Sequence, residues 1–295
     1  MSLMIIVICL IAERFLLEHQ HMRELRWLGR YSQWLAGPSV PQWLHQGFPG
    51  LLLLLLPPVL IVGILQHLFS NSLFGLPGVA FAGFILLYAL GPKDLDDQVN
   101  QLTSAVEEGD EDKTRDIAAE LIGDEPPVSE PAFSQAVAEA ILALANQRLY
   151  AVLFWFLLLG PMGAALYRIA SRLPHLDQAN RDLDFFLNAK QLLVILDWLP
   201  ARLTALCYAI AGSFEDALYG WRSYQERRFD EFSDSNSGTL ICTGSGAMRL
   251  TTLLEEADEG LQDYTHLPQA AMALIWRSLV VWLVIALFLS LIGLV

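Results

Sequence analysis

Long apolar runs separated by short polar stretches dominate the pattern of this 295-residue chain. The run from Leu51 to Phe69 is 19 residues without a formal charge, and the run from Leu73 to Leu90 is another 18. About 20 apolar residues cross the hydrocarbon core of a bilayer as a helix. With three residues between them, the two runs predict a transmembrane hairpin over residues 51–90.

The two ends of the chain differ in their predicted relation to the bilayer. Residues 273–295 form a third apolar run, which predicts a C-terminal transmembrane helix with Arg277 snorkelling to the interface. The N-terminal run from Leu3 to Ala12 is too short for a span, and it lacks the basic start and the cleavage site of a signal peptide. Residues 1–47 are therefore interpreted as an interfacial or re-entrant segment.

Helix breakers and charges interrupt the apolar pattern over residues 150–213. Gly160-Pro161 divides the first run, and a proline with two charged residues interrupts the second (Asp197, Pro200, Arg202). Broken helices at membrane depth are tolerated where they face protein or a wet cavity. The pattern predicts broken membrane helices that line a polar cavity. A kinked span that only packs is the alternative.

A polar, acidic stretch, residues 92–149, precedes the broken helices. Apolar residues recur in it at spacings of three and four on both sides of Gly109, and Pro131 opens a third group that leads to the membrane. These spacings predict two amphipathic helices with a turn at Gly109, and a third helix from Pro131. Residues 214–271 are expected to form a cytoplasmic loop.

No strand alternation stands out, so the predicted fold class is all-α: a polytopic helical membrane protein with broken or re-entrant helices around a polar cavity and cytoplasmic amphipathic helices. Lys and Arg favour cytoplasmic loops. Residues 13–47 hold four arginines before Phe48 and the turn at 70–72 holds none, which places the N-terminal and acidic segments in the cytoplasm. Four basic residues in 168–190 leave open whether residues 150–167 cross fully or dip and return.

Composition agrees with an integral membrane protein whose main partner is the lipid bilayer. Hydrophobic residues make up 54% of the chain. Of the net charge of −14, residues 92–131 supply −10, with 13 acidic against three basic residues. No basic stripe indicates nucleic-acid binding. The three cysteines are interpreted as small buried hydrophobes, and the six histidines have no metal-site spacing.

Two arginines border apolar runs and are the first candidates for function. Arg168 ends one run and Arg202 lies near the start of another. Inserting a guanidinium into hydrocarbon costs roughly 3 kcal/mol, so both are expected at an interface or in a polar cavity. With Arg249 they could bind an anion, because guanidinium groups match carboxylates and phosphates. The alternative is that they pair with Asp197 or Glu139 and stabilise helix packing.

Glycines near residue 240 are a weaker candidate. Gly238, Gly244 and Gly246 are expected in a loop whose backbone can approach a ligand, although the string lacks the Lys-Ser/Thr of a phosphate-binding loop.

Several strings, taken in order, resemble a known family. They are EEGDEDKTRDIAAELIG, LFWFLLLGPMGAALYR, LDWLPARLTA, SNSG and GSGAMRL. Together they resemble the CbiB/CobD family of cobalamin-biosynthesis membrane proteins over most of the chain. Within that superfamily the chain looks most like the AmpE group of the Gram-negative inner membrane, which is associated with β-lactamase regulation and antibiotic resistance.

The resemblance implies a site and the loss of part of it. CbiB/CobD proteins carry out an ATP-dependent amide synthesis that needs carboxylates to hold Mg²⁺ and phosphate. Where that family has Asp-Asp before the PARL string, this chain has Leu193-Val194. Where the family has Glu-Asn and then Asp, this chain has Ala145-Asn146 followed by Gln147-Arg148. Pro174 and His175 stand where an Asp is expected after the Tyr-Arg pair.

The resemblance thus implies a regulatory membrane protein without catalytic residues, metal or cofactor, which holds an anionic small molecule in a degenerate ligase-like cavity. The residues expected to contribute to that cavity are Arg168, Arg202, Tyr167, Glu139, Asn146, Asn236, Gly238, Arg249, Glu13 and His21. Two alternatives stay open: an ATP- and Mg-dependent amide ligase like CbiB/CobD, and a structural membrane protein whose acidic helices dock a cytoplasmic protein partner.

Overall fold

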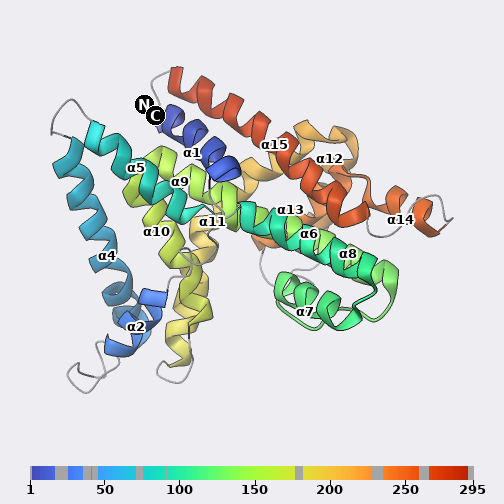
Figure 1. Ribbon diagram of the computed structural model, residues 1–295, viewed down its shortest axis with the longest axis horizontal. Helices are drawn as coiled ribbons and strands as arrows, with labels where there is room; N and C mark the ends of the chain where they lie inside the picture. Colours follow the sequence, from blue (N-terminus) through green and yellow to red (C-terminus); the bar gives the residue numbers. More distant parts are fainter. Residues whose placement is uncertain are drawn as a thin grey trace. The chain divides into compact units, whose positions relative to one another are not determined.

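The computed structural model describes the chain as helices in two compact units (Figure 1). Unit 1 comprises residues 1–90 with 151–196, and unit 2 comprises residues 91–150 with 197–294. The described residues contain no strand, so the all-α prediction is confirmed. They are residues 2–16, 26–35, 41, 46–70, 76–90, 92–176, 182–226, 235–258 and 266–291.

Unit 1 holds the N-terminal and central apolar helices. They are α1 (Ser2–Leu16), α2 (Arg26–Leu35), α4 (Gly47–Ser70), α5 (Leu76–Ala89), α9 (Ala151–Leu159), α10 (Pro161–Arg172), the short 3-10 turn η4 (Leu173–His175) and the first part of α11 (Leu183–Ala211). Unit 2 holds α6 (Pro92–Glu108), α7 (Glu111–Ile122), α8 (Glu130–Ala145), the π turn η3 (Asn146–Tyr150), the rest of α11, α12 (Phe214–Glu226), α13 (Ser235–Ala247), α14 (Leu250–Asp258) and α15 (His266–Leu291).

Among the described residues, four helices are long and apolar enough to cross a membrane: Gly47–Phe69, Glu130–Leu159, Leu183–Ala211 and His266–Leu291. The first and last correspond to predicted spans. For the second arm of the predicted hairpin, the structure describes the apolar helix α5 over 14 residues, and residues 71–75 lie outside the described residues. The hairpin therefore stays a prediction.

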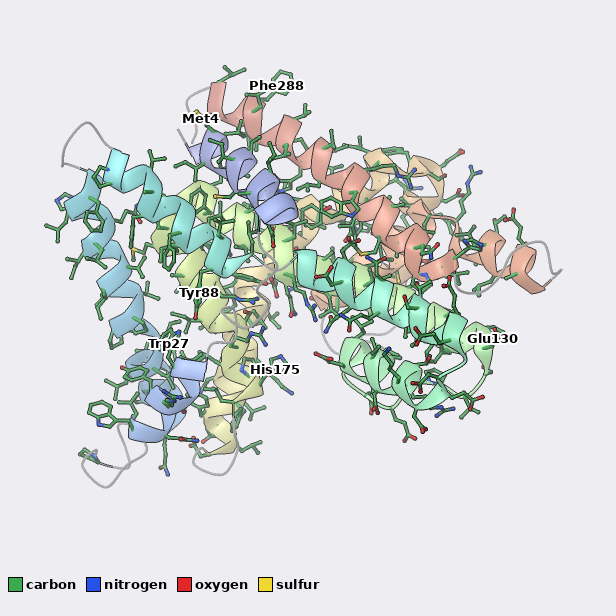
Figure 2. All side chains as sticks on the ribbon, in the orientation of Figure 1. Met4, Trp27, Tyr88, Glu130, His175 and Phe288 are labelled. Carbon is green, nitrogen blue, oxygen red and sulfur yellow. The ribbon has the colours of Figure 1, made fainter. Side chains whose placement is uncertain are left out.

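The N-terminal helices pack within unit 1. α1 is one continuous helix of 15 residues, and the thiol of Cys9 lies 3.6 Å from the carbonyl oxygen of Gly83 on α5. On α2, the indole Nε1 of Trp27 donates a hydrogen bond of 3.0 Å to the hydroxyl of Tyr88 (Figure 2). The interfacial or re-entrant role of this segment stays a prediction.

The predicted break at Gly160-Pro161 is present, and a polar side chain from another helix holds it. Gly160 has φ 67° and ψ −151°, a conformation open to glycine almost alone. The amide of Gln66 on α4 donates to the carbonyl of Leu159 at 3.3 Å and accepts from the N–H of Met162 at 3.0 Å. One side chain therefore satisfies backbone groups on both sides of the break.

The second predicted break is wrong, because α11 runs unbroken for 29 residues through Pro200. A proline has no N–H, so it leaves the carbonyl four residues earlier, that of Leu196, without its helical partner. The indole Nε1 of Trp155 donates to this carbonyl at 3.2 Å. The missing hydrogen bond is replaced from outside the helix, and the helix continues.

The acidic helices follow the sequence pattern. Gly109, with φ 71°, separates α6 from α7, and the Asp110 side chain caps α7 by accepting from the N–H of Lys113 at 3.1 Å. α8 opens with Pro131 in its first turn, as predicted. It then continues through η3 into α9 as one apolar helix, so the expected boundary at residue 149 falls inside a candidate span.

The expected loop at residues 214–271 is wrong for the described part of that stretch, which forms α12, α13, α14 and the start of α15. Two buried tyrosines join helices in the core of unit 2. Tyr150 donates to the carbonyl of Ile275 at 2.8 Å and Tyr208 donates to that of Leu142 at 2.9 Å. Their rings meet edge to face at 6.1 Å between centroids.

Candidate functional site

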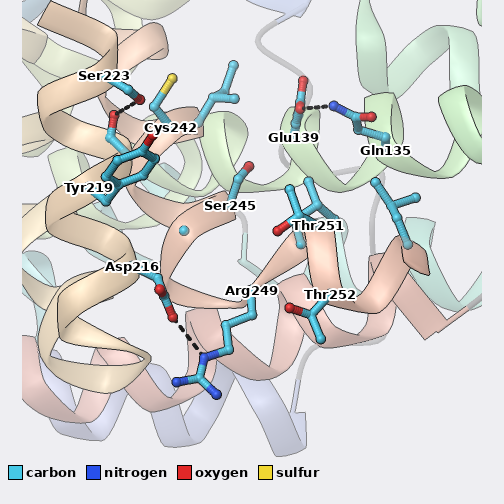
Figure 3. A pocket seen from close by; sticks show the side chains of 15 residues that line it. Gln135, Glu139, Asp216, Tyr219, Ser223, Cys242, Ser245, Arg249, Thr251 and Thr252 are labelled. Atoms are coloured by element: carbon cyan, nitrogen blue, oxygen red, sulfur yellow. Dashed lines mark hydrogen bonds and ion pairs between the residues drawn. The ribbon is translucent and has the colours of Figure 1, made fainter. Parts of the chain in front are cut away.

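A cavity of about 790 Å³ in unit 2 is lined by four helices (Figure 3). This volume lies within the range of about 300–1,000 Å³ that is usual for small-molecule sites. α8 and α12 contribute most of the acidic and aromatic groups, and α13 and α14 contribute serine, threonine, cysteine and arginine. The polar lining residues are Gln135, Glu139, Asp216, Tyr219, Ser223, Cys242, Ser245, Arg249, Thr251 and Thr252.

Arg249 stands at the junction of α13 and α14 in a strained conformation. Its φ of 54° is left-handed, which costs a residue with a Cβ atom about 1–2 kcal/mol. The position ends α13, where glycine is usual. In this conformation the Nε of Arg249 lies 2.8 Å from Oδ2 of Asp216 on α12, so the guanidinium already holds a carboxylate.

Asp216 has a pKa that its hydrogen-bond partners lower. The Ser213 hydroxyl donates to its Oδ2, and this bond, followed by that from Arg249, holds the pKa of Asp216 below its ordinary value of 3.8. Asp216 is therefore ionised at neutral pH. It faces Arg249 as a charge-assisted pair in a partly exposed setting, where such pairs contribute little to stability.

The opposite wall of the cavity presents a second carboxylate. Glu139 on α8 accepts a hydrogen bond of 2.8 Å from the side-chain amide of Gln135, one turn earlier. Glu139 and Arg249 are the two predicted ligand residues that the structure brings to this cavity. The predicted anion site at Arg249 is therefore occupied in part by Asp216, and Glu139 adds a further negative charge.

Asn146, another predicted residue, lies in a buried polar cluster in unit 2. It begins the π turn η3, and π turns recur at functional sites. Its Nδ2 donates to Oδ1 of Asp197 at 3.1 Å, and its Oδ1 accepts from the Thr204 hydroxyl at 3.1 Å. All three side chains are buried among apolar helices. Polar groups in this setting are costly unless paired, and here they pair with one another.

Arg202 and Asn236 are also brought together, as predicted residues of one site. The guanidinium of Arg202 donates to Oδ1 of Asn236 at 3.2 Å and to the carbonyl of Trp198 at 2.7 Å. Its Cζ lies 4.2 Å from the centroid of the Trp198 ring, within cation–π range. These contacts orient Arg202 along α11 and toward α13.

The expectation that Gly238, Gly244 and Gly246 form a ligand-approaching loop is wrong, because all three lie in helix α13. A Cβ atom at Gly238 would lie 2.4 Å from the Tyr224 ring, and one at Gly246 would lie 2.3 Å from the Asp216 carbonyl oxygen. Gly238 and Gly246 let α12 and α13 approach closely, and Gly244 lets α13 pack against Leu142 on α8. Gly246 also lines the cavity.

The remaining predicted residues belong to unit 1 or lie outside the described residues. Tyr167 and Arg168 are buried on α10, and Glu13 is buried on α1. His21 lies outside the described residues. At His175, where the resemblance implies a carboxylate, burial lowers the pKa below its ordinary value of 6.5, and Arg172 and Lys190 lower it further. A neutral imidazole does not replace an acid.

The carboxylates of the cavity are engaged by the protein's own side chains. Magnesium prefers an octahedron of oxygen ligands, and phosphate charge must be offset by cations. In the cavity, Asp216 is held by Ser213 and Arg249, and Glu139 is held by Gln135. Within the described ranges, no group of three or more His, Cys, Asp or Glu side chains could hold a metal ion.

Sequence reasoning missed most of the cavity lining. Tyr219, Ser223, Thr251 and Thr252 fall in the stretch that was expected to be a loop. A signal was present, since apolar residues recur with helical spacing along α12 (Phe214, Ala217, Leu218, Trp221). No local signal indicated that α8, more than 70 residues earlier, supplies the opposite wall.

Comparisons with known proteins agree with the strings noted in the sequence. A family model described as CobD/Cbib protein matches residues 6–257. The cobalamin biosynthesis protein CobD of Chromobacterium violaceum is 32% identical over 167 residues, which cover 56% of this chain and 52% of that protein. The protein of the same name from Stutzerimonas stutzeri is 27% identical over 275 residues, 88% of this chain and 87% of the relative. No solved structure matches the chain.

Proposed function

This chain belongs to the CobD/CbiB protein family, and we propose, from the resemblance of its sequence strings, that within this family it is a membrane-bound regulatory modulator of the AmpE type, associated with β-lactamase regulation. It uses the family scaffold to bind a small polar molecule in the cavity of unit 2, and it does not join that molecule to a second substrate. The proposed location is the bacterial inner membrane, which its long apolar helices would span several times.

One observation carries the proposal: the carboxylates of the cavity are engaged by the protein's own side chains. Asp216 is held by Arg249 and Ser213, and Glu139 by Gln135. A synthase that activates a carboxylate with ATP needs acidic side chains available to a metal ion. Leu193-Val194, where the resemblance implies two aspartates, points the same way, since aliphatic side chains cannot bind a cation.

The expected anionic ligand fits this cavity less well than the sequence indicated. Arg249 faces Asp216, and Arg202 is engaged by Asn236 and the Trp198 carbonyl. The three candidate arginines are divided between the units, with Arg168 in unit 1. An anion bound by Arg168 stays a prediction.

A gene deletion tests the regulatory proposal. In a Gram-negative host that carries this gene and an inducible chromosomal β-lactamase, we expect the deletion to change β-lactamase activity after exposure to a β-lactam. The wild-type gene supplied on a plasmid should restore the original response, and the empty plasmid should not. An induction curve that the deletion leaves unchanged contradicts the proposal.

The second candidate is an ATP-dependent amide ligase of cobalamin biosynthesis, and the printed names of the relatives favour it. Expression in a strain that lacks its own CobD-type synthase decides between the two. We expect no recovery of corrinoid synthesis, because the cavity does not supply the oxygen ligands of a magnesium-nucleotide site. Recovery in proportion to the amount of protein in the membrane would establish the ligase.

A further inference from the structure

The cavity of unit 2 combines a nearly balanced set of charges with a wall of hydroxyl groups. One arginine against two carboxylates leaves a net formal charge of −1 among the lining residues. Five lining side chains are hydroxyls: Tyr219, Ser223, Ser245, Thr251 and Thr252. This composition is the starting point for identifying the ligand.

Both kinds of ionic ligand are disfavoured. An anion would have to displace Asp216 from Arg249 and approach Glu139, which has the same sign of charge. A cation would have to compete with Arg249 for Asp216 and with the Gln135 amide for Glu139. Asp216 is thus paired with Arg249, and Glu139 is hydrogen-bonded to the neutral Gln135 amide, before a ligand arrives; both carboxylates still offer hydrogen-bond capacity.

The hydroxyl wall favours a ligand that both donates and accepts hydrogen bonds. Each hydroxyl offers one donor and two acceptor positions. Ser223 uses its donor on the carbonyl of Gly220, at 2.9 Å, so its oxygen can still accept. The Oγ atom of Ser245 is shielded from solvent and makes no hydrogen bond in the structure. Figure 3 shows this side chain on α13, with its hydroxyl turned toward the helix that carries Glu139 and Gln135.

Planar side chains also line the cavity of unit 2. Carboxylate, amide and guanidinium groups can each contact two neighbouring hydroxyls of one molecule, and Glu139, Gln135 and Arg249 provide one of each. Tyr219, 77% exposed on α12, offers an aromatic face against which the C–H face of a ring can pack. The cavity volume of about 790 Å³ admits a ring-sized molecule with its substituents.

We propose that this cavity binds an uncharged, hydroxyl-rich compound of sugar size, held by Glu139, Gln135 and the hydroxyl wall. This inference rests on the proposed function in one respect, since it names the ligand class of the same cavity. It differs from the expectation of an anionic ligand, because the structure pairs Arg249 with Asp216.

The chain carries a built-in reporter for occupancy. Cys242 lines the cavity and is partly exposed, whereas Cys9 and Cys207 are buried. Maleimide reacts with accessible thiols, so Cys242 should be labelled first in the wild-type protein. Peptide mapping by mass spectrometry separates the three cysteines, and the two buried ones serve as internal references for general stabilisation of the fold.

The test measures the rate at which N-ethylmaleimide labels Cys242 in the full-length protein in lipid nanodiscs. The probes are methyl β-glucoside and N-acetylglucosamine as uncharged sugars, sodium phosphate as an anion and ethanolamine as a cation. We expect at least one sugar to slow Cys242 labelling about tenfold at saturation, with less than about twofold change from phosphate or ethanolamine.

Matched variants on neighbouring helices sharpen the test. Glu139→Gln keeps the shape of the side chain but replaces one carboxylate oxygen, an acceptor, with an NH₂ group, a donor. The protection of Cys242 by a sugar should therefore fall about tenfold. Glu215→Gln removes the same charge next to Asp216, outside the cavity lining, and should keep full protection.

Three results would overturn the inference: no protection by either sugar, protection that is equal in Glu139→Gln, or stronger protection by phosphate or ethanolamine. If a sugar protects Cys242 but deletion of the gene leaves β-lactamase induction unchanged, this inference stands and the proposed function is rejected. If no sugar protects Cys242 but the deletion changes induction, the proposed function stands and this inference is rejected.

Discussion

At the scale of single residues, polar side chains complete hydrogen bonds that the backbone cannot make. Gln66 bridges the break at Gly160, and the Trp155 indole replaces the N–H that Pro200 lacks. The sequence predicted the break from Gly160-Pro161 because those two residues are adjacent. It could not predict Gln66, which lies 93 residues from the carbonyl that it binds, since only packing of α4 against α10 brings them together.

Replacing Gln66 with leucine should destabilise unit 1. The substitution leaves the Leu159 carbonyl and the Met162 N–H without this partner, and each lost hydrogen bond costs about 0.5–1.5 kcal/mol. The apparent melting temperature in detergent should fall. Gln101→Leu, at an exposed position on α6, is the control and should leave it unchanged. Equal melting temperatures for both variants would show that Gln66 does not hold the break.

The ion pair at the cavity should make stability depend on acidity. Because the pKa of Asp216 lies below its ordinary value of 3.8, the charged form contributes stability at higher pH, and this contribution is lost as the pH falls through the lowered pKa. Asp216→Asn should therefore melt at a lower temperature than the wild type near pH 7. The gap should close once the pH has fallen below the lowered pKa of Asp216. A gap of constant size across this range would exclude ionisation of Asp216 as its cause.

At the scale of helices, the sequence predicted where structure forms better than where it is interrupted. The amphipathic pair around Gly109 follows from local spacing and a local cap, so it was predictable. Two interpretations were wrong for a shared reason. The proline of α11 and the glycines of α13 look like breakers in isolation, but packing against other helices decides their role: the Trp155 indole bonds to the Leu196 carbonyl, and the Tyr224 ring leaves no room for a Cβ atom at Gly238.

A double-mutant cycle tests the account of α11. Trp155→Phe removes the indole donor and should cost about 1–3 kcal/mol, because it leaves the Leu196 carbonyl unpaired. In a Pro200→Ala background the new N–H can bond to that carbonyl within the helix, so the same change should cost much less. Unfolding in a chemical denaturant measures all four proteins. Additive effects would mean that the indole and the proline are independent.

At the scale of the whole molecule, the protein family could be predicted from the sequence, but the residues that form the candidate site could not. Membership of the CobD/CbiB family was recognisable from strings such as GPMGAALYR, and the family match confirms it. The predicted site residues, however, are divided between two units, and only Glu139 and Arg249 line the cavity. Which side chains meet depends on long-range helix packing, and a linear motif does not encode it.

On the proposed function, this family scaffold regulates by binding a ligand at the cavity of unit 2. The most direct measurement is β-lactamase induction in the deletion strain that carries either the wild-type gene, Glu139→Gln or Glu215→Gln, with equal protein amounts confirmed in the membrane. The account predicts that the wild type and Glu215→Gln restore the response and that Glu139→Gln does not. Full restoration by Glu139→Gln, or failure of the wild type itself, would contradict it.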